Sequence, residues 1–443
     1  MSEKTFIILC KIFCIGLLLQ FVANTFVSFQ IGWDNTFTDI FRLWKELFVI
    51  AWSLFVTYSI WKNKMWKQKD IVRYMTLVFI ALMWFALVVT LGKWLSISRF
   101  LKAWKYDFIG YMIFLMAYYL SFHYKKETLL SLVQRFLRVI KTLLVWAVVW
   151  YLILLVKPGA LKLLWYDRLS IEGEVGKRPP AVYWTREFEW YPRNQFLFER
   201  PISWWFFLTA FFPLFFVQFL QRKSLKKTWL RWLLFGGNII LTFSRAAWLS
   251  WILELMILGF ISYRKQISFF AKKVLLPTII IFAGIAWVAK DQVINRQFSN
   301  TGHIQLLKQG RTYFAQHWIT GMGAGSIGPA SHWIGGLNFN PENQYLQIAI
   351  EFWIIWFAIW MAFYSRLHYI WYKELQAQRK QKQLSITTRY VIAFSIGMVG
   401  LSVSGLVLHS FTDRMIIYPF MLLGGIIYYL AMHPIIEKQK GGR

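Results

Sequence analysis

Charged residues are scarce in this sequence of 443 amino acids. They make up 16% of the chain, whereas a soluble domain carries about a quarter. Hydrophobic residues account for 58%, and the mean hydropathy is +0.45. Apolar runs at 74–91 and 275–289 are long enough, or nearly so, to cross the hydrocarbon layer of a bilayer. This composition excludes a soluble globular protein and predicts a polytopic membrane protein.

Acidic residues and cysteines are also few. The chain has 20 Asp and Glu against 50 Lys and Arg, a formal net charge of +30. The basic residues gather in short connections between apolar runs, as the positive-inside rule requires, which argues against a nucleic-acid partner. Cys10 and Cys14 lie one helical turn apart in the first apolar run, so neither a disulfide framework nor a zinc site is expected. No small-residue cleavage site follows that run, so we expect a retained helix rather than a signal peptide.

The apolar runs predict an all-α polytopic membrane protein of about twelve transmembrane helices, forming a single integral-membrane domain over residues 1–443. Strongly basic connections all fall on one side together with both termini, and the orientation rule makes that side cytoplasmic. One of them, 123–138, is predicted to form an amphipathic helix on the inner leaflet. The expected spans are 5–25, 41–60, 74–91, 107–122, 139–156, 202–220, 229–243, 246–263, 274–289, 343–364, 390–409 and 414–432.

Two long loops, 157–201 and 290–341, are predicted on the outer side. The first carries an excess of arginine, for which two explanations stay open. The first is that the orientation rule does not apply to long loops. The second is that arginine guanidinium groups bind an anionic ligand such as diphosphate through two parallel hydrogen bonds. The arginines concerned are Arg168, Arg178, Arg186, Arg193 and Arg200.

Polar residues of the second half of the chain are candidates for chemistry. Arg245 follows Ser244 at a tight outward turn, where a functional role competes with simple snorkelling of a helix-end arginine. Arg311 precedes Phe314 and Trp318 at spacings that predict a short amphipathic helix lying on the membrane. The glycine-rich stretch 321–328 lacks the preceding strand and following Lys-Ser/Thr of a nucleotide loop, so we expect a tight turn that lets the backbone approach lipid headgroups.

The run PENQYLQIAIE at 341–351 opens an apolar helix with polar residues at its mouth. Glu342 and Asn343 in a first helical turn would favour the positive end of the helix dipole, which is the structural explanation for them. Glu351 lies about two turns inside, where a charged group is costly unless paired. His303, His317 and His332 lack metal-ligand spacing, and no metal site is expected. His409, Asp413 and Arg414 lie at a second short outer turn, where we expect them to pair with one another.

The order of these motifs resembles the O-antigen ligase/polymerase superfamily. Between about Trp229 and Tyr364 the chain carries, in this order, LTFSR, an arginine seven residues before a tryptophan, GxGxGS and ENQYLQxxxE. The resemblance implies a membrane glycosyltransferase with a GT-C-like helical fold and an outer catalytic loop, 290–341. It further implies an undecaprenyl-diphosphate-linked glycan donor, a glycan or lipid acceptor, the bacterial inner membrane, and no metal or cofactor. Arg245 and Arg311 match the family's diphosphate-binding arginines.

One departure from the family pattern is informative. Ligases of this family carry His-Asn-x-Tyr-Leu where this chain has Glu342-Asn343-Gln344-Tyr345-Leu346, so the usual catalytic histidine is missing. This weakens the case for lipopolysaccharide ligation and leaves room for a polymerase, with Glu342 either as the base or as the residue that orients the acceptor. We expect the substrate to contact a further set of residues, namely Asn343, Tyr345, Arg193, Arg200 and His409.

Two other functions use similar parts. A flippase or transporter of the same lipid-linked sugar would need polar residues through the middle of the membrane and repeat symmetry. The polar groups concentrate instead at the outer face, which favours an enzyme. Transfer of glycan onto protein requires the same residues as polymerisation, so that alternative stays open.

Overall fold

A computed structural model describes helices and turns, and no strand, over the ranges that it covers. These ranges are 3–31, 43–63, 71–157, 160, 193–198, 200–216, 225–262, 267–288, 290, 297–331, 337, 339–352, 361, 365, 369, 376 and 385–433. The helices are α1 (Glu3–Ile31), α3 (Trp44–Lys62), α4 (Ile71–Gly92), α5 (Ile97–Asp107), α6 (Ile109–Ser121), α7 (Lys126–Val156), α9 (Pro201–Phe215), α10 (Leu225–Ile240), α11 (Arg245–Ser262), α12 (Ile267–Phe270), η6 (Ala271–Leu275), α13 (Leu276–Val288), α15 (Gln297–His317), α16 (Gly328–Ser331), α18 (Ile386–Gly405), η7 (Ser410–Thr412) and α19 (Arg414–Met432). Residues 344–352 form a further helix.

The all-α membrane fold is confirmed at the level of its helices. Each of the twelve expected spans overlaps a helix within the described ranges. Five helical stretches are long and apolar enough to cross a membrane, and these are Val72–Gly92, Lys126–Val156, Ala271–Val288, Ile386–Gly405 and Arg414–Met432. The total of twelve membrane crossings stays a prediction.

The helix expected to lie separately on the inner leaflet, 123–138, is instead the first half of α7. This helix runs without interruption from Lys126 to Val156. No proline or glycine occurs within it, so nothing ends the helix at the predicted boundary. Buried side chains recur every three or four residues along its whole length, from Leu129 through Phe136 and Leu144 to Leu154. The prediction of two separate helices was therefore wrong.

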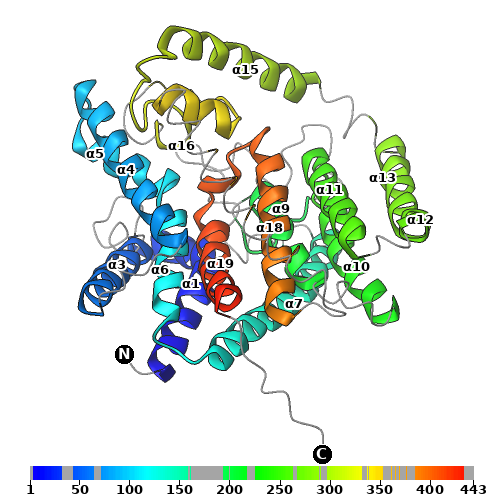
Figure 1. The fold of residues 1–443 in the computed structure, drawn as a ribbon. Coiled ribbons are helices and arrows are strands. Elements are labelled where there is room, and N and C mark those ends of the chain that lie inside the picture. Colours follow the sequence, from blue (N-terminus) through cyan, green and yellow to red (C-terminus); the bar gives the residue numbers. More distant parts are fainter. Residues whose placement is uncertain are drawn as a thin grey trace, which may run out of the picture.

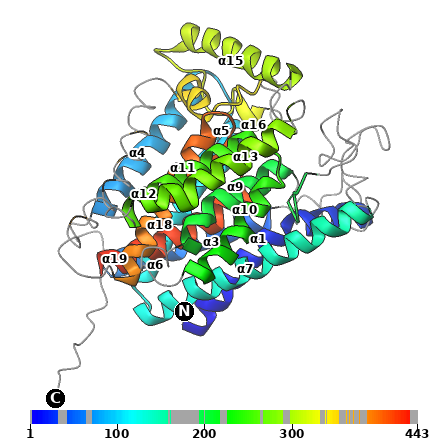
Figure 2. The same ribbon diagram turned by 90° about the vertical axis from the view of Figure 1, so that its right-hand side faces the viewer.

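The core is built around α18 and α19. Helix α19 packs on α6, α18, α1, α7 and α9, and α18 packs on α9 and α11, an arrangement that Figures 1 and 2 show from two sides. In the apolar 18-residue stretch of each helix, 78% of α18 and 83% of α19 are buried inside the protein, against 28% of α4. A helix that is apolar all round and mostly uncovered by protein faces lipid, so α4 is peripheral and α19 central.

Close packing of the central helices depends on small residues. A Cβ atom at Gly425 of α19 would lie 2.2 Å from the carbonyl oxygen of Phe114 in α6, and one at Gly397 of α18 would lie 2.4 Å from that of Ala210 in α9. Only glycine permits these approaches, as is common where helices pack in membranes.

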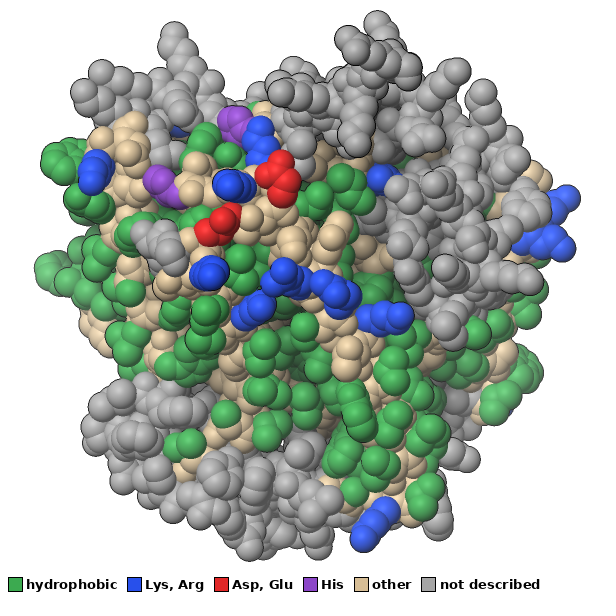
Figure 3. Space-filling model, turned by 90° about the horizontal axis from the view of Figure 1, so that it is seen from below, with side chains coloured by type: hydrophobic (Ala, Val, Ile, Leu, Met, Phe, Trp, Pro, Cys, Tyr) green, Lys and Arg blue, Asp and Glu red, His purple; other side chains and the backbone are tan. Residues whose placement is uncertain are grey.

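The two ends of the bundle differ. Helix α15 lies across one end, with α16 beneath it (Figures 1 and 2). The opposite end, where α1 begins, carries a band of Lys and Arg side chains among apolar ones (Figure 3). The polar groups predicted to carry chemistry lie toward the α15 end.

Candidate active site beneath helix α15

Helix α15 is held against the protein by a small apolar cluster of its own. Ile327, Phe339 and Ile350 form the buried centre of this cluster, and Leu306 and Phe314 of α15 pack against it. The helix near Arg311 is longer than expected, and its contact with the membrane stays a prediction. The helix has 21 residues, and Phe314 packs on the cluster of Ile327, Phe339 and Ile350.

Arg245 is the first residue of α11 and reaches α15. The guanidinium is exposed, and its Nη2 donates a hydrogen bond of 2.7 Å to Oδ1 of Asn300. The preceding turn includes Phe243 in the left-handed region, at φ 48°. This turn ends α10 and sets the direction from which Arg245 leaves the bundle.

Arg193 packs on the same turn between α10 and α11. Its Nε donates to the carbonyl oxygen of Thr242 at 2.7 Å, and the N–H of Asn194 donates to the carbonyl of Leu241 at 2.8 Å. Arg193 and Arg245 therefore belong to one local structure, although many residues separate them in sequence. Arg200, at the N-cap position of α9, is exposed. The other loop arginines, Arg168, Arg178 and Arg186, lie outside the described residues.

Glu342 pairs with a histidine of α15. Its carboxylate Oε2 contacts Nδ1 of His303, and the two side chains are 31% and 37% exposed, so a substrate can reach the pair. The Glu342 backbone has φ 50°, and its N–H donates to Oδ1 of Asn340 at 3.3 Å. A left-handed backbone is uncommon for a non-glycine residue and is concentrated at functional sites.

Asn343, and not Glu342, caps the following helix. The N–H of Leu346 donates to Oδ1 of Asn343 at 2.9 Å, and the helix begins at residue 344. Glu342 stands before the cap, where its positive φ turns the chain away from the helix axis. Glu342 therefore does not lie in the first helical turn, as the dipole explanation requires, and asparagine, one of the preferred N-cap residues, takes the capping role here.

Helix α15 brings Arg245 and Glu342 to neighbouring positions. Their partners, Asn300 and His303, are three residues apart on α15, a rise of about 4.5 Å along its axis. Sequence reasoning did not select Asn300, and it gave His303 no role. Their i, i+3 spacing was visible, but nothing local indicated which distant residues each would meet.

Arg311 lies farther along the same helix. It is eleven residues beyond Asn300, about 16 Å along the helix axis, and it is exposed. Positions 300, 304, 307 and 311 follow one stripe of a helix, so Arg311 shares the side of α15 that carries Asn300. Ile304 and Leu307, which lie between them, are 53% and 40% exposed. The structure thus places Arg245 and Arg311 on one side of α15 but three turns apart.

The stretch from α10 to the helix that follows Glu342 matches a known protein family. Residues 230–361 fit the family model described as O-antigen ligase. These residues are similar to that family over the matched stretch and are called the O-antigen ligase region below. The resemblance predicted from the sequence between about Trp229 and Tyr364 is thereby confirmed, and the matched family implies an enzyme of the glycosyltransferase type. The region covers less than a third of the chain. No curated protein and no solved structure matches the chain significantly.

Within the O-antigen ligase region, Asn343 and Tyr345 anchor their helix to α18. Nδ2 of Asn343 donates to the carbonyl of Leu406 at 2.8 Å, and the Tyr345 hydroxyl donates to the carbonyl of Ser402 at 2.7 Å. Both side chains thus have a structural role that places Glu342. The prediction that they also contact substrate stays a prediction.

The glycine-rich turn of the O-antigen ligase region is a tight turn, as expected. All four glycines have positive φ: 63° at Gly321, 86° at Gly323, 71° at Gly325 and 73° at Gly328. At Gly328 a Cβ atom would also lie 2.4 Å from Cδ of Gln347. Left-handed turns closely packed against a helix are the case in which only glycine fits.

Backbone N–H groups of this turn bind protein oxygens, and the turn is mostly buried. The expected approach to lipid headgroups was therefore wrong, because α4 and the 344–352 helix cover the turn. The bonds run from Met322 to the carbonyl of Ile350 at 2.9 Å, from Gly323 to the carbonyl of Glu351 at 2.9 Å, from Ala324 to Oγ1 of Thr90 at 3.1 Å and from Gly328 to the carbonyl of Phe339 at 2.8 Å.

Glu351 has a structural reason for its depth. The side chain is fully buried, and Oε1 accepts a hydrogen bond of 3.3 Å from the N–H of Ile327. Oε2 accepts one of 3.2 Å from Nε2 of Gln347. The carboxyl group thus joins the glycine-rich turn to the helix that follows Glu342, which fits the rule that buried polar groups are hydrogen-bonded.

The expected cluster of His409, Asp413 and Arg414 does not form. Asp413 caps α19, accepting from the N–H of Met415 at 3.2 Å, and Arg414 bonds Glu46 of α3 at 2.9 Å. His409 is buried, and burial lowers the pKa of its imidazole to about 3. At neutral pH the ring is uncharged and a weak base. The prediction failed because α3 brings an acid to Arg414 that no local pattern showed.

Within the described ranges, no group of three or more His, Cys, Asp or Glu side chains is placed to hold a metal ion.

Proposed function

We propose that this chain polymerises or ligates undecaprenyl-diphosphate-linked oligosaccharide on the outer face of the inner membrane, in O-antigen, capsule or exopolysaccharide assembly. The observation that carries the proposal is the docking of Arg245 and Glu342 one helical turn apart on α15. A cation for the leaving diphosphate and a base for the acceptor are the two parts that this transfer needs. Both lie in the O-antigen ligase region.

The proposed reaction is a single displacement at the anomeric carbon. The acceptor hydroxyl oxygen forms a bond to that carbon as its proton passes to the Glu342 carboxylate. The bond from the anomeric carbon to the diphosphate oxygen breaks, and the lipid diphosphate leaves with its electron pair. Arg245 and Arg311 neutralise the charge that develops on the diphosphate, so the transfer is proposed to be independent of metal ions.

His303 is proposed to position the base. A side chain that hydrogen-bonds one carboxylate oxygen fixes the direction of the other, as orienting groups do in catalytic triads. The left-handed backbone at Glu342, held through Asn340, adds a second constraint on the same carboxylate. The loop therefore presents Glu342 in a defined orientation toward the outer side.

One observation favours the transporter alternative. Glu254 of α11 is fully buried and lies against Gly400 of α18, within the bundle. An acidic side chain within a transmembrane bundle is, by default, a candidate functional residue. Ser250, one turn from Glu254 toward Arg245 on α11, is also buried and shares a hydrogen bond of 3.2 Å with Ser404 of α18. Whether the protein forms a glycosidic bond or moves intact donor decides between the two functions.

A reconstitution experiment tests the proposed function. Purified protein with the lipid-linked repeat unit as the only substrate should yield products that grow by one repeat unit at a time if it is a polymerase. A ligase should instead need a separate lipid or protein acceptor. Movement of intact donor across vesicle membranes, without a new glycosidic bond under either condition, would establish the transporter alternative instead.

The orientation of the molecule is proposed from the basic band at the end opposite α15. In a background with Cys10 and Cys14 replaced by serine, Thr301→Cys on α15 should react with a membrane-impermeant maleimide in intact spheroplasts. Gln134→Cys on α7 should react only after permeabilisation, and both positions are exposed in the structure. The reverse pattern would place α15 in the cytoplasm and refute an outer active site.

A further inference from the structure

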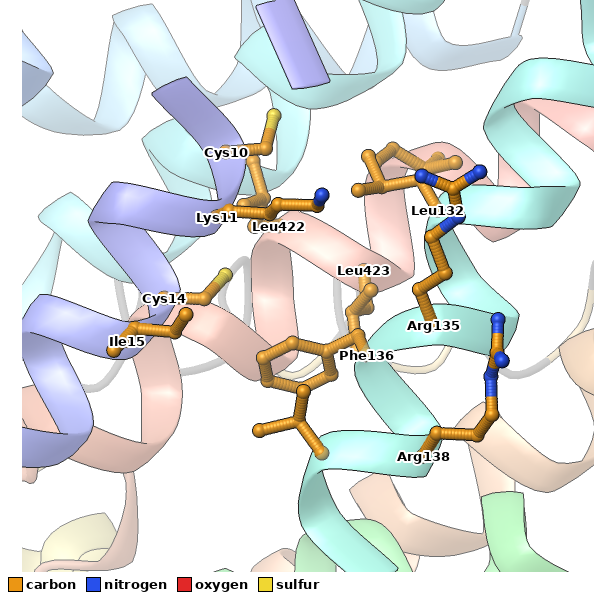
Figure 4. A pocket seen from close by; sticks show the side chains of 12 residues that line it. Cys10, Lys11, Cys14, Ile15, Leu132, Arg135, Phe136, Arg138, Leu422 and Leu423 are labelled. Carbon is orange, nitrogen blue, oxygen red and sulfur yellow. The ribbon is translucent and has the colours of Figure 1, made fainter. Parts of the chain in front are cut away.

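A cavity of about 430 Å³ lies between α1, α7 and α19, away from the candidate active site (Figure 4). Helix α19 supplies its floor through residues such as Leu423, and α1 and α7 supply its walls. Both cysteines of the chain, Cys10 and Cys14, line it. Most of the lining is apolar, so the interior suits hydrocarbon.

Three basic side chains complete the lining. Lys11 comes from α1, and Arg135 and Arg138 come from α7, one turn apart. All three are exposed, and no acidic residue lines the cavity. An apolar occupant alone would not need three positive charges, and free phosphate would gain nothing from the apolar interior.

We propose that this cavity binds an anionic glycerophospholipid. One acyl chain lies in the apolar interior, and the headgroup phosphate lies between Lys11, Arg135 and Arg138, where arginine forks bind phosphate oxygens in a bidentate manner. This site is separate from the proposed transferase chemistry and does not depend on it.

The surroundings of the cavity match such a lipid. A shallow hollow on the neighbouring face of α1, formed by Ile8, Ile12, Ile15 and Gly16, shares Lys11 and Ile15 with the cavity. This hollow offers a path for a second acyl chain along the surface of α1. Basic side chains at the level of a headgroup layer recognise anionic lipids by charge.

The test is native mass spectrometry of the full-length protein released from detergent with phosphatidylglycerol or phosphatidylcholine. Phosphatidylglycerol should remain bound with at least tenfold preference. Arg135→Gln/Arg138→Gln should weaken its binding by about thirty-fold, since each basic residue contributes about fivefold to attraction by anionic lipid. Lys272→Gln/Lys273→Gln removes the same charge from exposed positions of η6 outside the cavity and should leave binding unchanged.

A second pair of variants tests the acyl chain site without changing charge. Cys14→Phe fills the cavity and should abolish retention of phosphatidylglycerol, whereas Cys14→Ala keeps the space and should bind as wild type does. Phosphatidylglycerol with a diazirine in its acyl chain should crosslink to α1, α7 or α19. If the arginine variant does not fold, the comparison with phosphatidylcholine and the two Cys14 variants still test whether the cavity binds an anionic lipid.

Several outcomes would overturn the proposal. Equal retention of phosphatidylcholine would remove the headgroup site, and displacement by millimolar inorganic phosphate would reassign the basic residues to a soluble anion. Wild-type binding by Cys14→Phe, or crosslinks confined to other helices, would place the lipid elsewhere. Equal losses in the Lys272/Lys273 variant would show only general attraction by the charge of the protein.

Discussion

Glu342→Gln should lower turnover by about 10²-fold or more with the fold intact, because glutamine keeps the size and hydrogen bonding of the side chain but cannot accept the acceptor's proton. The measurement is the initial rate of glycosidic bond formation with purified protein and lipid-linked donor. Thermal unfolding in the same detergent serves as the measure of folding. The structure sharpens this prediction, because Asn343 caps the helix and Glu342 therefore has no capping role to lose.

Two histidines of α15 provide a matched comparison for this prediction. His303→Ala removes the partner of Glu342 and should reduce the rate by about tenfold or more, since positioned proton transfer contributes about 10²–10⁴-fold. His317→Ala, at the other end of α15, should leave the rate near wild type. Glu342→His should keep partial activity if the pocket accepts the residue that ligases carry. A wild-type rate for Glu342→Gln would make Glu342 a tether for α15 and remove it as the base, and the buried Glu351 and His409 are poorly placed to replace it.

Arg245→Lys and Arg311→Lys should each reduce turnover by about 10²-fold, because a point charge replaces a bidentate fork on the leaving diphosphate. Asn300→Ala is the control for Arg245, since it removes the 2.7 Å bond to α15 and keeps the guanidinium. A small effect of Asn300→Ala beside a large effect of Arg245→Lys supports a role toward substrate. Equal effects would mean that Arg245 only holds α15 in place, and wild-type turnover by both lysine variants would remove the diphosphate role.

The double variant Arg245→Lys/Arg311→Lys tests whether the two arginines act on one group. When two residues act on one group, the double variant loses far less activity than the product of the losses of the two single variants. We expect such a non-additive loss, although about three turns of α15 separate Arg311 from the partner of Arg245. If the two losses multiply, Arg311 acts on a different part of the substrate, such as the acceptor glycan.

Local information was sufficient for the membrane class and most of the helices, and it selected several candidate site residues. Apolar runs predict helices because a backbone in lipid must satisfy its hydrogen bonds within the helix, and helical hydrogen bonds are local. Arg245, Arg311 and Glu342 stand out because polar groups beside apolar runs need a reason. The glycine-rich turn was predictable because glycine tolerates positive φ, which is a property of single residues.

Tertiary structure alone decided which of these residues meet. The bonds of Arg245 to Asn300 and of Glu342 to His303 form because α15 folds back across the end of the bundle. The pairing of Arg414 with Glu46 is equally distant in sequence. Helical periodicity describes one helix face at a time and carries no information about which face of another segment will cover it. The sequence by itself therefore determined the membrane class, the helices and the candidate residues, and the packing of α15 decided how those residues form a site.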